Sequence, residues 1–282
     1  MLQSALFSPY RSLPSTSAAY YCLLFLPESQ RAPLRAMFYL DQTLRQALRR
    51  VSDISLAVGK HVFWQEELRA LVNPSTPESS LRHPLSQHLN SFKTLKSHSF
   101  DCLLEREAML MEQTRFLDEA NLGDYLALQS RCWQLWQNVY TDLIGAPHVN
   151  IDALAKALER IRIVCQLGKD AQEGRIFIPV NTLQRFDIRA AYLINHQPNP
   201  NINTWLAQEA NQIEVSIQTQ LQAMNVNDRY HSRPFLIFLQ IARERLKKSI
   251  TIGAEIVRQP VVLSPLQKIY PSWKTWVFSR WV

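Results

Sequence analysis

Helical patterns recur along almost the whole chain, and this periodicity restricts what the chain can fold into. Only 6 glycines and 15 prolines in 282 residues leave few turn signals, whereas Leu, Ala, Gln, Arg and Glu, which favour helices, are abundant. The length is within reach of one large hydrophobic core. We therefore predict an all-α fold, a single large helical bundle that forms one domain over residues 1–282.

The apolar spacing also predicts where the helices lie. They are expected at residues 17–26, 30–51, 58–71, 99–115, 123–144, 151–168, 204–224 and 234–252. Two segments rich in Asn and Pro, 73–80 and 195–203, predict the clearest breaks. The pair His83-Pro84 fits the start of a further helix.

The chain is basic, with a formal net charge of +7, which favours an acidic partner surface. The basic residues are spread over the predicted helices, and no nucleic-acid module is recognised, so we predict no nucleic-acid partner. An anionic lipid surface or a diphosphate fits this charge. The 4 cysteines lack a Cys-x-x-Cys spacing, which predicts neither a zinc site nor a disulfide framework and favours a reducing, cytoplasmic compartment.

The sequence does not strongly suggest any other chemistry. No apolar run reaches the 18 residues of a transmembrane helix. No glycine-rich phosphate loop, Gly-x-Ser-x-Gly or His-Glu-x-x-His is found, so the sequence gives no indication of nucleotide, serine-hydrolase or zinc-protease chemistry. The histidines are scattered without the spacing of metal ligands.

The most informative local motif is Gln-Leu-Gly-Lys-Asp-Ala-Gln-Glu-Gly-Arg-Ile-Phe-Ile-Pro at 166–179. It resembles a metal-binding motif of the squalene/phytoene synthases, which reads Asp-x-x-x-Asp, then Gly-Arg and a Tyr-Leu-Pro-like exit. Gln166 stands where the first aspartate is expected, and Asp170, Gly174, Arg175 and Pro179 match.

Other landmarks of the same family follow in the same order over nearly the whole chain. They are Arg31, Leu34, Ala36 and Phe38, then Trp64-Gln-Glu-Glu-Leu68, His83-Pro84, Arg233-Pro234 and Lys268. The resemblance implies a helical isoprenoid synthase fold. It also implies head-to-head condensation of two allylic diphosphates, with magnesium held by two Asp-x-x-x-Asp motifs on facing helices.

The first of those motifs is replaced by basic residues. Its positions fall at Arg45, Gln46 and Arg49, where no carboxylate is present. At about 6 Å and an effective dielectric constant near 20, one unit charge pair contributes roughly 3 kcal/mol, so we expect no magnesium at this face. Under the resemblance, the two arginines bind an anion or pair with Asp170 and Glu173. A solvated helix face, with Asp41 at the same four-residue spacing, is the alternative.

The predicted ligand-binding residues are therefore Arg45, Arg49, Gln166, Asp170 and Arg175, with no catalytic residue retained. We predict no cofactor. Asp170 and Glu173 are the metal candidates, and with Asp41 they are the acids from which a metal site would be rebuilt. Mg²⁺ is expected only if the protein is an active enzyme.

Large side chains occupy a helix that carries small residues in the family. Trp133 and Trp136 stand where the resemblance implies room for prenyl chains. We predict that these tryptophans pack in the core or at an interface, and large side chains at this depth would fill a volume that a prenyl tail needs.

The tail at 269–282 carries three tryptophans among basic residues. This composition suits a bilayer interface, and docking onto the bundle or a dimer contact are the alternatives.

The sequence leads to three candidate functions. The favoured one is a pseudoenzyme that has lost prenyl transfer and binds a prenyl diphosphate, an anionic phospholipid or a protein partner that it helps assemble. The others are an active prenyltransferase with an unorthodox metal site and a peripheral scaffold at the inner face of a membrane.

Overall fold

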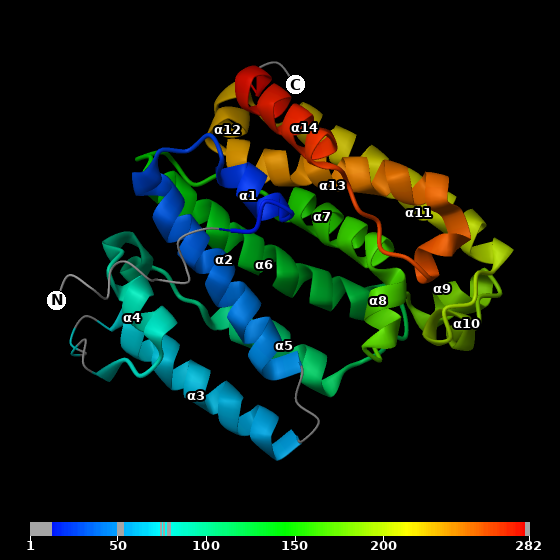
Figure 1. Ribbon diagram of the computed structural model, residues 1–282, viewed down its shortest axis with the longest axis horizontal. Helices are drawn as coiled ribbons and strands as arrows, with labels where there is room; N and C mark the ends of the chain where they lie inside the picture. The colour runs from blue at the N-terminus through cyan, green and yellow to red at the C-terminus, as the bar shows by residue number, and fades with distance from the viewer. Residues whose placement is uncertain (1–12, 50–53, 74, 76, 78–79, 280–282) are drawn as a thin grey trace. The chain divides into compact units, whose positions relative to one another are not determined.

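The computed structural model describes residues 13–49, 54–73, 75, 77 and 80–279, and the elements within them are helices (Figure 1). A single isolated β-bridge, between Arg115 and Ile176, is the only β pairing found in these residues. None of the helices is long and apolar enough to cross a membrane, as far as the described residues show.

The described residues fall into two compact units, Met1–Met111 with Gln134–Val149, and Glu112–Trp133 with Asn150–Val282. Because one helix contributes to both, the chain passes between the units without a linker at that point. The single domain stays a prediction.

The first unit holds helices α1 (Ala18–Leu23), α2 (Glu28–Arg49), α3 (Ile54–Val72), α4 (Pro84–Asn90), η2 (Lys93–Ser97) and α5 (Asp101–Glu112), with the second part of α6 (Glu119–Leu143). Helix α2 packs on α1, α3 and α4. Its buried side chains, Leu34, Met37, Leu40, Leu44 and Leu48, recur every three or four residues, which places them on one face.

The second unit holds α7 (Asp152–Cys165), α8 (Leu167–Gln172), α9 (Val180–Arg185), α10 (Ala190–Ile194), α11 (Pro200–Ala223), α12 (Val226–His231), α13 (Arg233–Ile252), η3 (Gly253–Val257) and α14 (Pro265–Phe278). Helix α7 packs against α11 and α13, and α14 lies along α13 (Figure 1). The buried face of α7 includes Leu154, Leu158, Ile161 and Cys165.

Several predicted boundaries are wrong by up to four residues, and two of them have a clear physical cause. The helix expected over 151–168 stops at Cys165, because Gln166 leaves the helical region with φ −115° and ψ 14°, and α8 begins directly after it. The break expected over 195–203 ends early, since α11 starts at Pro200. There the Asn199 side chain accepts a hydrogen bond from the amide of Asn201, and proline tolerates the first helical turn.

The short helices α8, α9, α10 and α12 and the helix α14 were not predicted. Short helices carry too few periodic apolar residues to stand out in a sequence. The predicted end of the second helix at 51 and part of the break at 73–80 lie outside the described residues. The predicted start of a helix at His83-Pro84 is confirmed, since the His83 ring caps α4 by accepting from the amide of Leu85.

Candidate functional site

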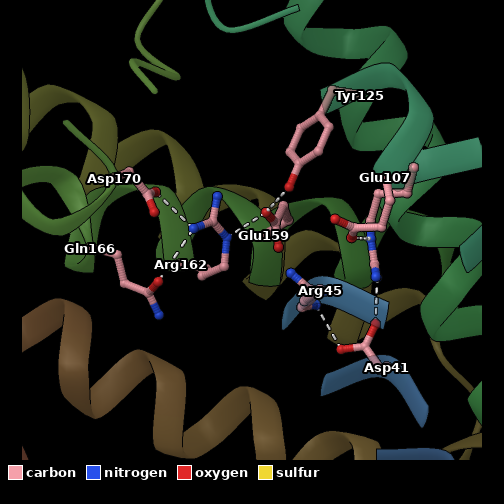
Figure 2. A network of polar contacts seen from close by, with 9 residues as sticks. Asp41, Arg45, Glu107, Tyr125, Glu159, Arg162, Gln166 and Asp170 are labelled. Atoms are coloured by element: carbon pink, nitrogen blue, oxygen red, sulfur yellow. Dashed lines mark hydrogen bonds and ion pairs between the residues drawn. The ribbon is translucent and has the colours of Figure 1, made fainter. Parts of the chain in front are cut away.

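The turn between α7 and α8 gathers the polar side chains of the 166–179 motif around one arginine (Figure 2). Arg162, in the last turn of α7, donates from Nη1 to Oδ2 of Asp170 on α8 over 2.8 Å. The same nitrogen lies 3.4 Å from Oε1 of Gln166, which occupies the turn itself. Gln166 and Asp170, predicted as ligand-binding residues, are therefore brought together by a cation that sequence reasoning missed.

Arg162 binds a second acid as well (Figure 2). Its Nε donates to Oε1 of Glu159 over 2.5 Å, and the Tyr125 hydroxyl donates to the same oxygen over 2.7 Å. The guanidinium also lies over the Phe177 ring, 4.7 Å from its centroid. One arginine thus holds two carboxylates, and an aromatic ring covers one of its faces.

We call Tyr125, Glu159, Arg162, Gln166 and Asp170 the Arg162 cluster. Burial affects the pKa values of two of its members, Asp170 and Arg162. Glu159 is 2% exposed and Asp170 8% exposed. Burial raises the pKa of Asp170 above its ordinary value, and the attraction of Arg162 offsets only part of that effect. Burial opposes charging of Arg162, but the attraction of Glu159 and Asp170 outweighs it and holds the arginine pKa well above its usual range.

The Gly174-Arg175 segment of the motif turns back toward α8. Gly174 has φ +78°, a conformation that glycine adopts without a steric penalty. This turn lets the amide of Arg175 donate to the carbonyl oxygen of Asp170 over 2.8 Å. The Arg175 side chain lies 3.5 Å from a carboxylate oxygen of Glu173. The predicted binding residue Arg175 and the metal candidate Glu173 therefore form an ion pair with each other.

In the first unit, a second charged cluster surrounds Asp41 on α2 (Figure 2). Arg45 donates from Nε to Oδ2 of Asp41 over 2.7 Å, one helical turn away. Nη1 of Arg106, on α5, lies 2.6 Å from Oδ1 of the same carboxylate. Arg106 is fully buried and also donates to Glu107 over 2.7 Å. These four residues form the Asp41 cluster.

Two cations decide the charge of Asp41. Burial favours the neutral acid, but the attraction of Arg106 and of Arg45 outweighs it, so the pKa of Asp41 is held well below its ordinary value. Asp41 therefore stays ionised at neutral pH. Arg49 is the last residue of α2, and its side chain lies outside the described part of the chain.

Trp133 and Trp136 pack against aromatic side chains, as predicted. Trp136 is 5% exposed, and its ring centroid lies 5.3 Å from that of Phe38 on α2. Trp133 contacts Phe235 and Phe238 of α13 at 5.8 Å and 4.7 Å. Both tryptophans are thus held within the helical packing of their units.

Sequence reasoning missed Arg162, Glu159, Tyr125 and Arg106. A signal was present for Arg162 and Glu159, because they lie three residues apart on a helix, next to the apolar Leu158, Ile161 and Ile163. Arg106 gave no comparable signal. Over the described residues, no group of three His, Cys, Asp or Glu side chains is arranged to hold a metal ion.

Comparisons with known proteins agree with this architecture. The family model described as squalene/phytoene synthase matches residues 14–267, so the chain belongs to the squalene/phytoene synthase family. A crystal structure of a dehydrosqualene synthase in complex with ligand is similar, with a TM-score of 0.70 and 14% identity, over 93% of this chain and 91% of that chain. Curated proteins give no match. The predicted all-α isoprenoid synthase fold is confirmed.

Proposed function

We propose that this protein binds an anionic prenyl or phospholipid ligand with arginine side chains and no longer transfers prenyl groups. The observation that carries the proposal is the position of Arg162, whose guanidinium sits between Glu159 and Asp170 at the family's second metal motif. A cation of the protein's own thus occupies the place beside the remaining aspartate.

The charge of this cluster does not fit magnesium. Glu159 and Asp170 carry two negative charges, and Arg162 cancels one of them. At about 4 Å and an effective dielectric constant near 20, a divalent ion and a guanidinium repel each other by roughly 8 kcal/mol, which offsets the attraction of one carboxylate at that distance and leaves one net negative charge for a doubly charged ion. Gln166 supplies only a neutral amide oxygen in place of the carboxylate that such an ion prefers.

Arg45 is the residue best suited to hold an anion. Its side chain is 23% exposed, and a guanidinium fork matches the geometry of phosphate oxygens. Its carboxylate partner, Asp41, is shared with the fully buried Arg106. Asp41 therefore keeps the cation Arg106 when Arg45 turns to an incoming phosphate, so the exchange leaves no unpaired carboxylate.

The packing of Trp136 supports the loss of prenyl transfer. Its ring contacts Phe38, which lies on the same helix as Arg45 and nearly two turns before it. Small residues at the matching positions would leave space for prenyl chains, whereas an indole and a phenyl ring in contact fill that volume.

An active prenyltransferase is the second candidate, and one observation favours it. The Asp170, Gly174 and Arg175 part of the motif keeps a defined turn, closed by the hydrogen bond from the Arg175 amide to the Asp170 carbonyl. Assembly of a protein partner is the remaining possibility within the same family, and we propose it only if no anionic ligand binds.

Titration of the purified protein with farnesyl diphosphate in the presence of a chelator tests the proposal. We expect binding, and we expect Arg45→Gln to weaken it about tenfold, the effect of one lost charge-assisted contact. Arg82→Gln is the matched control in the same unit, because the Arg82 side chain is 53% exposed, forms an ion pair with exposed Glu66 and lies over the Phe63 ring. Equal affinity of wild type and Arg45→Gln would refute the arginine site.

A further inference from the structure

Helix α14 is fixed to the second unit by one of its sides. Ser264 caps the helix in a capping box with Gln267. Lys268, Ser272 and Thr275 are buried against the bundle, where α14 lies along α13 (Figure 1). Of the alternatives that the sequence left open for the tail, docking onto the bundle is what the structure shows for residues up to 279. Residues 280–282 lie outside the described part.

A cation–π contact adds to this attachment. The guanidinium of Arg233, the first residue of α13, lies 3.9 Å from the ring centroid of Trp276 and 3.8 Å from that of Tyr230. An arginine between two aromatic rings holds the C-terminal half of α14 in a defined orientation. The opposite side of α14 is therefore presented outward and is not free to rotate into the core.

That outward side is apolar. Leu266, Tyr270, Trp273 and Val277 follow each other at intervals of four, three and four residues, so they form one stripe along the helix. Their exposed fractions are 76%, 63%, 48% and 49%. Single exposed apolar residues are ordinary on a protein surface, but four in one stripe on a docked helix indicate a surface that meets an apolar phase. We call this the α14 stripe.

The charge around the α14 stripe indicates which partner it binds. From Ile256 to Val282 the sequence contains no Asp or Glu, while Arg258, Lys268, Lys274 and Arg280 are basic. Lys274 is exposed and adjoins Trp273 within the stripe region. Trp and Tyr rings settle at the headgroup level of a bilayer, and lysine beside them is attracted to anionic headgroups. A second copy of the chain would instead bring like charges together.

We propose that the α14 stripe docks the protein on a lipid bilayer that carries anionic headgroups. The helix lies in the plane of the surface, with Leu266, Trp273 and Val277 in the acyl boundary and Lys274 at the phosphates. This proposal does not rest on the Arg45 site, because the contacts named above that hold α14 are made within the second unit.

Sedimentation with vesicles of phosphatidylcholine, with and without phosphatidylglycerol, tests the proposal. We expect the full-length protein to sediment with the anionic vesicles and much less with the neutral ones. The double variant Leu266→Ser with Trp273→Ser should bind at least about tenfold more weakly, because two exposed apolar side chains no longer enter the bilayer. Lys274→Gln should weaken binding to anionic vesicles about fivefold.

The matched control is Val215→Ser with Val226→Ser, two substitutions of valines that are 55% and 51% exposed elsewhere in the second unit. It should sediment as the wild type does. Failure of the wild type to sediment with either vesicle would overturn the proposal, and so would equal binding by the stripe variant. A stripe variant that changes only the oligomeric state, measured by light scattering, would also overturn it and assign the stripe to a protein contact.

Discussion

Replacing Arg162 by methionine tests whether one guanidinium holds the α7–α8 turn together. The substitution keeps much of the packing length of the side chain and removes the contacts to Glu159 at 2.5 Å and to Asp170 at 2.8 Å. Both carboxylates are more than nine-tenths buried as residues, so water cannot easily replace the lost cation. Breaking a buried pair in this way costs about 3–5 kcal/mol.

The expected result is a large fall in thermal stability. At roughly 2 °C for each kcal/mol in a chain of this size, the unfolding midpoint should drop by about 6–10 °C. Arg160→Met is the matched control on the same helix. Arg160 also holds two acids, Glu119 and Glu209, but Glu119 is 49% exposed and can regain water. Because Glu209 is 13% exposed, this control should cost about 1–2 kcal/mol, still less than Arg162→Met.

The pH dependence separates charge from packing in that experiment. Burial already raises the pKa of Asp170 in the native state, and loss of Arg162 must raise it further. A raised native pKa means that the folded protein binds the proton more tightly, so protonation stabilises it as the pH falls. The difference in free energy of unfolding between wild type and Arg162→Met should therefore become smaller as the pH falls from neutral to about 4. A small deficit that is constant with pH, measured by circular dichroism, would refute the account.

Two further predictions concern single residues. Asp41→Asn should make the free energy of unfolding less dependent on pH below pH about 4. The native pKa of Asp41 is depressed by Arg106 and Arg45, so its contribution is present above the unfolded value of about 3.9 and is lost as the pH falls below it; equal acid limbs for both proteins would contradict this. Gly174→Ala should cost about 1–2 kcal/mol in chemical denaturation, because alanine is strained at φ +78° although no atom lies within 4 Å of its methyl group. Unchanged stability of Gly174→Ala would contradict the positive φ at residue 174 in this turn.

The fold could be predicted because its long helices carry regular apolar patterns. Helix α2 shows this, since its buried leucines recur at helical intervals and need no distant partner to be recognised. The Trp-rich tail was noticed by composition, but Pro271 in its middle argues against a helix. The helix forms because its buried side packs on α13, a contact that the local sequence does not show.

The contact between Arg162 and Asp170 could not be predicted for a geometric reason. Residues eight apart on a continuous helix lie about 12 Å apart along its axis, too far for the contact between Arg162 and Asp170. Only the break at Gln166 brings them within 2.8 Å, and the nearest glycine, Gly168, lies two residues after it. Arg106 is a similar case, because its partner Asp41 lies on another helix and is 65 residues distant in the sequence.

The central claim is that arginines of this protein have replaced the metal-dependent chemistry of the squalene/phytoene synthase family. Calorimetric titration with farnesyl and geranylgeranyl diphosphate, with and without magnesium, followed by product analysis of the same mixtures, tests it most directly. We predict binding of equal affinity in both conditions and no condensed product. Binding that requires magnesium, accompanied by turnover, would contradict the account and show a working prenyltransferase site.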